Sequence, residues 1–263
     1  MDVLKRNHVN VFGNGSQPLL FAHGFGCDQL MWRFITPAFE EDYKIVLFDH
    51  IGFGQADNSA YSAAHYASLQ AYADDMLEIC AALSLRDIVF VGHSVSSMIG
   101  MLAAIKAPEL FQRLIFISPS PCYLNDGAYK GGLSLEEIEG LLEVLDSNYL
   151  KWAGEMAPVI MGNPDRPQLS QELEKSFCQS NQQIARDFAR LTFLSDNRTD
   201  LANLEVPTLL LQCDEDLIAP LAVGNYMHQH LKQNSLIILK AHGHCPQISA
   251  PVETIAAMKT ILG

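Results

Sequence analysis

The feature that most constrains the fold is an alternation of short apolar runs with longer stretches of helical periodicity. Such alternation is typical of a mostly parallel sheet covered by helices. Apolar residues recur at helical spacing within residues 69–83 and 98–105. The strands that we predict cover residues 19–23, 44–49, 87–92, 113–118, 207–212 and 235–240, with a polar-alternating edge strand near residues 3–11. The chain of 263 residues is therefore expected to fold into one α/β core.

The alternation breaks after the strand at 113–118, where a long helical stretch begins. Ser134 and Glu137 form a capping-box pattern, which predicts a helix running through Leu145. Further helices are predicted over residues 148–161, 170–179 and 181–195. We therefore predict a core at residues 1–120, a helical lid at residues 121–200 and the rest of the core at residues 201–263.

Apolar residues of this insertion either line a pocket or only pack the lid on the core, and the sequence leaves both possibilities open. They are Tyr123, Trp152, Met156, Ile160, Phe188 and Phe193. His93 and Ile218 complete the predicted pocket.

The pentapeptide Gly92-His93-Ser94-Val95-Ser96 lies between an apolar strand and an apolar-periodic helix. The G-x-S-x-G elbow of serine hydrolases has this strand-turn-helix context, but it carries glycine where this chain has Ser96. Since the residue two beyond the nucleophile is already helical, the demand at that position is steric. Serine adds only two heavy atoms, so we interpret Ser94 as a nucleophile on a working variant of the elbow.

A serine nucleophile needs a basic partner and an orienting carboxylate. The acidic segment 214–216 follows one predicted strand, and the segment 242–244, with two histidines, follows the next. The order Ser, Asp, His along the chain is that of α/β-hydrolases. The spacing alone does not choose among the acids or between the histidines.

Acyl transfer also needs hydrogen-bond donors for the oxyanion. The Gly-rich segment HGFGCDQ (23–29) lets backbone N–H groups approach a substrate. We assign the N–H groups of Phe25 and Val95 to an oxyanion hole. The alternative is an ordinary Gly-rich turn.

Composition excludes several function classes. The formal charge of −13, without clusters of Lys or Arg, argues against binding to nucleic acid or to an anionic membrane surface. The first ten residues lack the apolar region of a secretory signal, and no apolar run approaches the roughly 20 residues of a spanning helix, so we expect a cytoplasmic protein. No Cys or His cluster has metal-ligand spacing, and we expect neither a metal nor another cofactor.

Longer strings carry a resemblance that runs along essentially the whole chain. They are HGFGCDQ (23–29), FDHIGFG (48–54), VGHSVSSMIGMLAAIKAPELF (91–111), SPSPCYLND (118–126), QCDEDLIAP (212–220), VGNYMHQHL (223–231) and GHCP (243–246). Together they resemble the RsbQ-type α/β-hydrolases, bacterial stress-response regulators related to the plant karrikin and strigolactone receptor hydrolases.

This resemblance implies an α/β-hydrolase fold with a four-helix, V-shaped lid over an apolar pocket. It implies Asp216 as the acid and His244 as the base. The chain departs from its relatives at Ser96, where they carry glycine, and at Gln247, where many carry a second histidine.

Two functions are compatible with these patterns. The first is hydrolysis of a small apolar ester or lactone by Ser94, His244 and Asp216 through an acyl-enzyme. The second is a stress-signalling regulator whose pocket binds a small ligand and which acts through a protein partner of the phosphatase type, with slow or incidental hydrolysis.

Overall fold

The computed structural model describes residues 2–262. Within them, seven strands form one sheet in the order β1-β3-β2-β4-β5-β6-β7. β1 runs antiparallel to β3, and all other neighbouring strands are parallel. The strands are β1 (Asn10–Phe12), β2 (Gln17–Ala22), β3 (Tyr43–Leu47), β4 (Ile88–His93), β5 (Phe111–Ile117), β6 (Thr208–Glu215) and β7 (Asn234–His242). The predicted class, a mostly parallel sheet flanked by helices, is confirmed.

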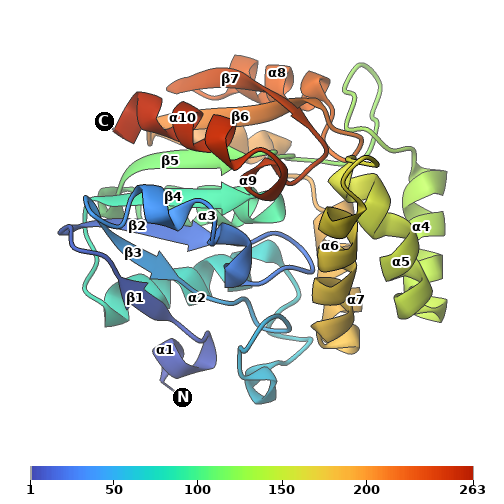
Figure 1. Cartoon of the computed structure of the whole chain (residues 1–263), viewed down its shortest axis with the longest axis horizontal. Helices are drawn as coiled ribbons and strands as arrows, with labels where there is room; N and C mark the ends of the chain where they lie inside the picture. Colours follow the sequence, from blue (N-terminus) through green and yellow to red (C-terminus); the bar gives the residue numbers. More distant parts are fainter. Residues whose placement is uncertain (1, 263) are drawn as a thin grey trace.

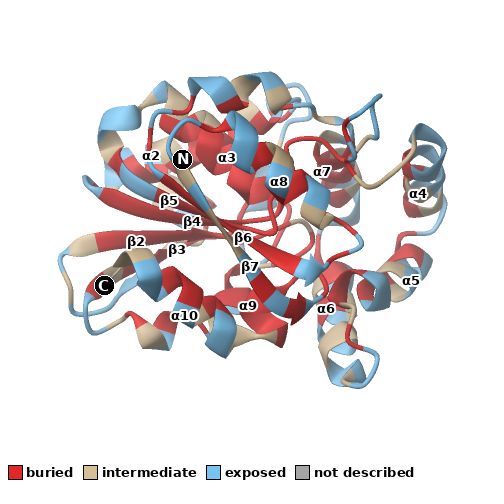
Figure 2. Cartoon of the chain, turned by 90° about the horizontal axis from the view of Figure 1, so that it is seen from above, coloured by how far each residue is buried: buried red, intermediate tan, exposed pale blue. Residues whose placement is uncertain are grey.

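Helices cover both faces of this sheet. Figure 2 shows α2, α3 and α8 along one face and α9 and α10 along the other, with the buried strands between them. Outside the insertion, the α-helices are α1 (Val3–Arg6), α2 (Leu69–Ala82), α3 (Val95–Lys106), α8 (Leu221–His230), α9 (Pro246–Ser249) and α10 (Pro251–Leu262). Because parallel strands are buried on both faces, their sequences are continuous apolar runs, which is why the runs were recognisable.

Four helices are inserted between β5 and β6 and gather beyond the carboxyl ends of the strands (Figure 1). They are α4 (Leu135–Ser147), α5 (Tyr149–Met161), α6 (Pro167–Gln179) and α7 (Gln182–Leu194). The predicted capping box is present, since the Glu137 N–H donates to Ser134 Oγ at 3.2 Å and the Ser134 N–H donates to Glu137 Oε2 at 2.7 Å. We call α4–α7 the insertion.

The prediction of an edge strand near residues 3–11 is wrong over its first half. Residues 3–6 form the short helix α1, which begins where the Asp2 carboxylate accepts the Leu4 N–H at 3.0 Å. His8 has a φ of 44°, which ends regular structure before the three exposed residues of β1. An N-terminal cap therefore overrides the alternating pattern on which the prediction was based.

Candidate active site

Ser94 lies at the turn between β4 and α3. Its backbone has φ 56° and ψ −125°, a conformation that side chains other than glycine seldom adopt. The N–H of Ser94 donates to the Ile117 carbonyl at 2.9 Å, which fixes the turn to β5. A Cβ on Gly92 would lie 2.7 Å from the Ser96 carbonyl oxygen, so the first residue of the pentapeptide must be glycine. The strand-turn-helix context predicted for Ser94 is confirmed.

The pairing of β6 with β7 brings the acidic and histidine segments together. Glu215 pairs with His242 after a register shift that follows Cys213. The Gly243 N–H donates to the Glu215 carbonyl at 2.7 Å, so the ladder continues to the residues just before Asp216 and His244. The two residues that leave these strand ends therefore project over the same edge of the sheet.

Ser94, His244 and Asp216 form one hydrogen-bonded chain. His244 Nε2 lies 2.7 Å from Ser94 Oγ, and His244 Nδ1 lies 2.7 Å from Asp216 Oδ2. Asp216 Oδ1 accepts the N–H groups of Ile218 at 2.8 Å and Ala219 at 3.1 Å. An imidazole held between a hydroxyl and a carboxylate can accept the hydroxyl proton, because the carboxylate stabilises the imidazolium that forms.

The neighbouring acids and the second histidine lie outside this chain. Glu215 and His242 face each other in an exposed pair, with 2.9 Å between Glu215 Oε2 and His242 Nδ1. The Asp214 carboxylate accepts the Ala241 N–H at 3.1 Å. Among the acids at 214–216, the structure thus brings Asp216 to the histidine that contacts Ser94.

Tyr123 reaches Ser94 from the loop that follows β5. Its hydroxyl lies 3.2 Å from Ser94 Oγ. Burial raises the pKa of Tyr123 to about 12, so the phenol is neutral. When the single Ser94 proton points at His244, the phenol must be the donor to Ser94 Oγ.

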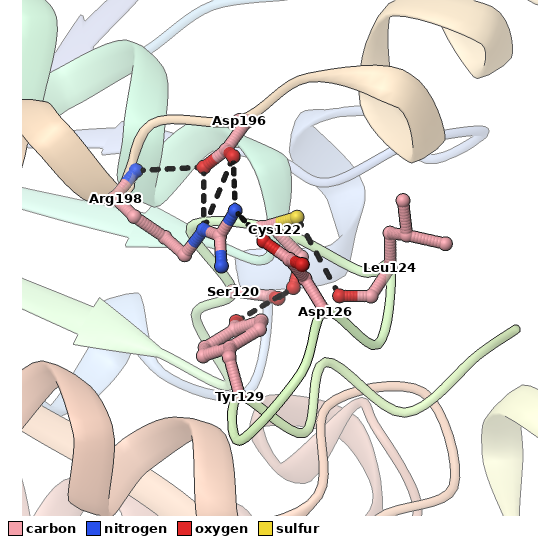
Figure 3. A network of polar contacts seen from close by, with 7 residues as sticks. All are labelled: Ser120, Cys122, Leu124, Asp126, Tyr129, Asp196 and Arg198. Atoms are coloured by element: carbon pink, nitrogen blue, oxygen red, sulfur yellow. Dashed lines mark hydrogen bonds and ion pairs between the residues drawn. The ribbon is translucent and has the colours of Figure 1, made fainter. Parts of the chain in front are cut away.

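An ionic network joins the segments that lead into and out of the insertion (Figure 3). The Arg198 guanidinium donates to Asp196 at 2.6 Å and to Asp126 at 2.9 Å. Asp196 also forms an isolated antiparallel bridge with Cys122, the residue before Tyr123. The segments entering and leaving the insertion are therefore fixed to each other beside the tyrosine.

The Gly-rich segment packs directly against the elbow. A Cβ on Gly24 would lie 3.3 Å from Ser94 Cβ and 2.4 Å from His93 Nδ1. Only glycine permits this approach, which carries the Phe25 backbone to the cavity at Ser94. Val95 is the first residue of α3, so its N–H has no acceptor within the helix.

Ser96 corrects the steric account of its position. Its side chain is fully buried, and its hydroxyl donates to the His23 carbonyl at 2.5 Å. His50 Nε2 lies 2.8 Å from the same oxygen. Position 96 is therefore a site of two hydrogen bonds as well as a site of limited volume, and the steric prediction did not include these bonds.

A cavity lies over Ser94, and its walls are mostly apolar. Five of the predicted pocket residues line it, namely His93, Tyr123, Ile160, Phe193 and Ile218. Five further residues that were not predicted for the pocket also line it, namely Cys27, Leu173, Phe177, Thr192 and Cys245. Leu173 and Phe177 are four residues apart on α6, so the helical periodicity of that segment could have revealed them.

Three predicted pocket residues lie outside this lining. Trp152 and Phe188 form a second layer behind Phe25, with ring centroids 5.5 and 6.2 Å from it. Met156 is partly buried against the same core. Trp152 and Phe188 therefore support the lining from behind, because both contact Phe25, which lines the cavity.

His93 supports the site through a hydrogen bond to the backbone of His244. Its Nε2 donates to the His244 carbonyl at 2.8 Å, which fixes the backbone of the histidine that contacts Ser94. Burial is the largest effect on the pKa of His93 and lowers it to about 3. Gln247 is buried as well, and its amide nitrogen lies 4.0 Å from the sulfur of Met31.

Within residues 2–262, no three His, Cys, Asp or Glu side chains lie close enough together to hold a metal ion. In the same part of the chain, no helix combines the length and the apolar character needed to cross a membrane.

Known proteins resemble this chain over nearly its full length. It is 36% identical over 253 residues to karrikin insensitive 2 receptor CA of Petunia hybrida, covering 95% of this chain and 94% of the relative. It is 36% identical over 262 residues to strigolactone esterase D14 of Arabidopsis thaliana, covering 99% and 98%. The solved structure of a hydrolase from Oleispira antarctica superposes with a TM-score of 0.97 at 37% identity, covering 99% of this chain and 96% of that one.

The predicted resemblance to the plant receptor hydrolases is confirmed by these relatives. Residues 19–258 also match the model of the alpha/beta hydrolase family. That match includes the whole sheet except β1 and the first strand residues of β2, and it contains Ser94, Asp216 and His244. The chain belongs to the alpha/beta hydrolase family.

Proposed function

We propose that this protein is a serine hydrolase that cleaves a small apolar ester or lactone through an acyl-enzyme. The observation that carries the proposal is the buried chain from Ser94 through His244 to Asp216, with both contacts at 2.7 Å. Ser94 is the nucleophile, His244 the base and Asp216 the residue that orients the base. The relative named strigolactone esterase supports the ester class.

The hydrogen bonds define the resting protonation state. The Asp216 carboxylate accepts the Nδ1–H of His244, which leaves Nε2 free to accept the Ser94 proton. As Ser94 Oγ bonds to the substrate carbonyl carbon, its proton moves to His244 Nε2. The imidazolium then gives this proton to the leaving alkoxide, and the acyl group stays on Ser94.

The carbonyl oxygen gains negative charge in this step. We assign the N–H groups of Phe25 and Val95 as its donors, because the Gly24 backbone packs against Ser94 and Val95 begins α3. The positive end of the α3 dipole adds to the stabilisation. A water molecule then attacks the acyl carbon while His244 accepts a proton from it. The bond to Ser94 Oγ breaks, His244 returns the proton to Ser94 Oγ, and the acid leaves.

The lining of the cavity supports an apolar substrate. Aromatic and aliphatic side chains from α5, α6 and α7 face Ser94, with few polar groups to recognise a charged substrate. A lactone presents the same carbonyl to Ser94 as an open ester does, so both fit this chemistry. We propose that the insertion acts as a lid over this cavity and sets which acyl groups enter.

Turnover of p-nitrophenyl acetate by the wild type and by Ser94→Ala tests this proposal. We expect Ser94→Ala to lose at least about a thousandfold in kcat/KM, or about 4 kcal/mol of transition-state stabilisation. Circular dichroism and the melting temperature would show that the variant is folded. Equal turnover by the two proteins would exclude Ser94 as the nucleophile.

A second candidate is a signalling regulator that binds a small ligand and acts on a protein partner, such as a phosphatase. The relative named karrikin insensitive 2 receptor favours it. Mass spectrometry of the denatured protein after exposure to butenolide lactones separates the two functions. A persistent adduct on the wild-type chain without repeated turnover would favour the regulator, whereas free product in excess over protein would favour the hydrolase.

A further inference from the structure

Ser96 begins a chain of hydrogen bonds that ends at the Gly-rich loop of residues 23–26, called here the oxyanion loop. The Ser96 hydroxyl donates to the His23 carbonyl, and the backbone N–H of His50 donates to His23 Nε2 at 3.0 Å. His23 Nδ1 lies 2.8 Å from the Gly24 carbonyl. The chain therefore joins the first turn of α3 to the backbone beside Phe25.

The donors in this chain are determined by counting protons. A carbonyl only accepts, so the one Ser96 proton goes to His23, and His50 Nε2 must donate to Ser96 Oγ. His23 Nε2 accepts the His50 N–H, so its proton is on Nδ1, which donates to the Gly24 carbonyl. Both imidazoles are neutral in this arrangement. Burial, the largest effect on each, lowers the pKa of both His23 and His50.

The last hydrogen bond acts on the peptide unit that contains the proposed oxyanion donor. The Gly24 carbonyl and the Phe25 N–H belong to the same peptide. The described chain contains no cis peptide, so this carbonyl and this N–H point in opposite directions. A donor that fixes the carbonyl of Gly24 therefore also fixes the direction of the Phe25 N–H.

We propose that Ser96 and His50 are positioning residues that hold the oxyanion loop in its catalytic orientation through His23. This inference rests on the proposed function, because it assigns a role to residues around the Phe25 N–H. Ser96 fixes the His23 carbonyl, and His50 fixes the direction of the Ser96 hydroxyl. In this chain the residue at position 96 supplies a hydrogen bond where glycine would supply only space.

The proposal distinguishes Ser96 from an adjacent serine with the same chemistry. Ser97 is equally buried on α3, and its hydroxyl donates to the Gly92 carbonyl at 2.9 Å. Ser96→Ala and Ser97→Ala each remove one buried hydroxyl that donates to a carbonyl. Only the first removes a contact with the oxyanion loop.

We expect Ser96→Ala to lower kcat for p-nitrophenyl acetate by ten- to a hundredfold, while KM changes less than about threefold. The range lies below the hundred- to thousandfold cost of deleting an oxyanion donor outright, because the Phe25 N–H is displaced and not removed. Ser97→Ala should stay within about twofold in kcat. Ser96→Gly should behave like Ser96→Ala, since neither has the hydroxyl.

Inhibition by a trifluoromethyl ketone distinguishes a positioning role of Ser96 from a purely structural one. The ketone's hemiketal with Ser94 places an oxyanion in the hole, so its inhibition constant should rise in proportion to the loss in kcat. A variant that only contains less active protein would lose kcat with an unchanged inhibition constant. A tenfold or larger loss in kcat with a matching rise in the inhibition constant supports the proposal, and either a smaller loss or an unchanged inhibition constant overturns it.

His50 gives an independent test if Ser96→Ala folds poorly. Gln places an N–H donor near the position of His50 Nε2, whereas Leu fills a similar volume without a donor. His50→Leu should lose kcat and inhibitor affinity together, and His50→Gln should recover at least half of the loss on a logarithmic scale. Equal effects of Gln and Leu would overturn the role of His50.

The failure of the proposed function would give a different pattern. It would appear as absent wild-type turnover, or as turnover that survives Ser94→Ala. If the wild type is active and Ser94→Ala is not, only the kcat values and inhibition constants of the variants at positions 50, 96 and 97 decide whether Ser96 and His50 are positioning residues.

Discussion

The buried His244 contacts Ser94, whereas the buried pair of His23 and His50 lies around Ser96, and the two sites differ in what their imidazoles contact. His244 lies 2.7 Å from the Asp216 carboxylate, with only 5% of its side chain exposed. His23 and His50 instead exchange hydrogen bonds with the backbone and with the Ser96 hydroxyl. The rings of His23 and His50 also meet edge to face, with centroids 4.8 Å apart.

The difference shows how the surroundings of a histidine in this fold suit it to one of two roles. An imidazole that accepts a proton during catalysis needs an adjacent negative charge, which Asp216 supplies. A histidine that holds a loop must keep one nitrogen bare and the other protonated, and burial without an ion pair maintains that state. On the proposed mechanism, His244 is the base because its ring lies between the Asp216 carboxylate and the Ser94 hydroxyl. His23 and His50 form no hydrogen bond with a carboxylate, which fits the supporting role proposed for them.

The largest test of this comparison removes the charge beside His244. Asp216→Asn keeps the shape but withdraws the stabilisation of the imidazolium, so we expect kcat to fall by about a hundred- to ten-thousandfold. Asp214→Asn is the matched control. Its amide oxygen can still accept the Ala241 N–H, so kcat should change less than about threefold.

Steady-state hydrolysis of an activated ester at saturating substrate measures both variants. A larger loss for Asp214→Asn than for Asp216→Asn would contradict the proposal that Asp216 is the carboxylate that orients His244.

The second test compares an aromatic residue of the cavity lining, Phe193, with one of the second layer, Trp152. Phe193 lines the cavity and packs on Tyr123, with ring centroids 5.3 Å apart, whereas Trp152 lies behind Phe25 on the side of the oxyanion loop. Phe193→Ala should shift the kcat/KM ratio between butyrate and acetate esters by about tenfold. Trp152→Ala should mainly lower stability, by about 3–5 kcal/mol, the typical cost of truncating a buried aromatic residue.

The ratio of kcat/KM values for p-nitrophenyl acetate and butyrate, with urea unfolding of each variant, measures the two effects. If Trp152→Ala changed the acyl preference more than Phe193→Ala, the second layer would have to be counted as part of the pocket.

Much of the fold and of the candidate site follows from local patterns. Continuous apolar runs mark buried parallel strands, so β2 to β7 were predicted within a few residues. The elbow at Ser94 also has a local signature, because strand, turn and helix follow one another in the chain. The choice of Asp216 and His244 came from family resemblance, since β6–β7 pairing decides which side chains meet.

The remaining parts depend on contacts between distant residues. Ser96 is 46 residues from His50 and 73 from His23, and nothing in the pentapeptide indicates where its hydroxyl points. Position 96 was therefore judged by volume, which left out its hydrogen bonds. Likewise, the packing of four inserted helices decides that Phe193 faces the cavity while Trp152 lies behind it.

The smallest expected effect concerns the pH dependence of stability that His50 contributes. Burial lowers the pKa of His50 in the folded protein, whereas in the unfolded chain this histidine has an ordinary pKa of about 6.5. Below that pH the unfolded state holds more protons, so the free energy of unfolding falls as the pH drops. Each such histidine contributes a slope of up to about 1.4 kcal/mol per pH unit.

His50→Gln removes this titration while keeping a donor near Ser96. Between pH 6 and pH 5, the free energy of unfolding of this variant should therefore fall less steeply than that of the wild type, by up to about 1.4 kcal/mol per pH unit. Tyr72→Phe is the control. The Tyr72 ring lies 5.7 Å from that of His50, and burial raises the pKa of Tyr72 further above its ordinary value, so this tyrosine does not titrate between pH 5 and pH 7. Urea unfolding at pH 7, 6 and 5 measures the slopes. Equal slopes for the wild type and His50→Gln would mean that His50 takes up a proton in the folded protein, and His50 would then not be the neutral donor that we propose for Ser96.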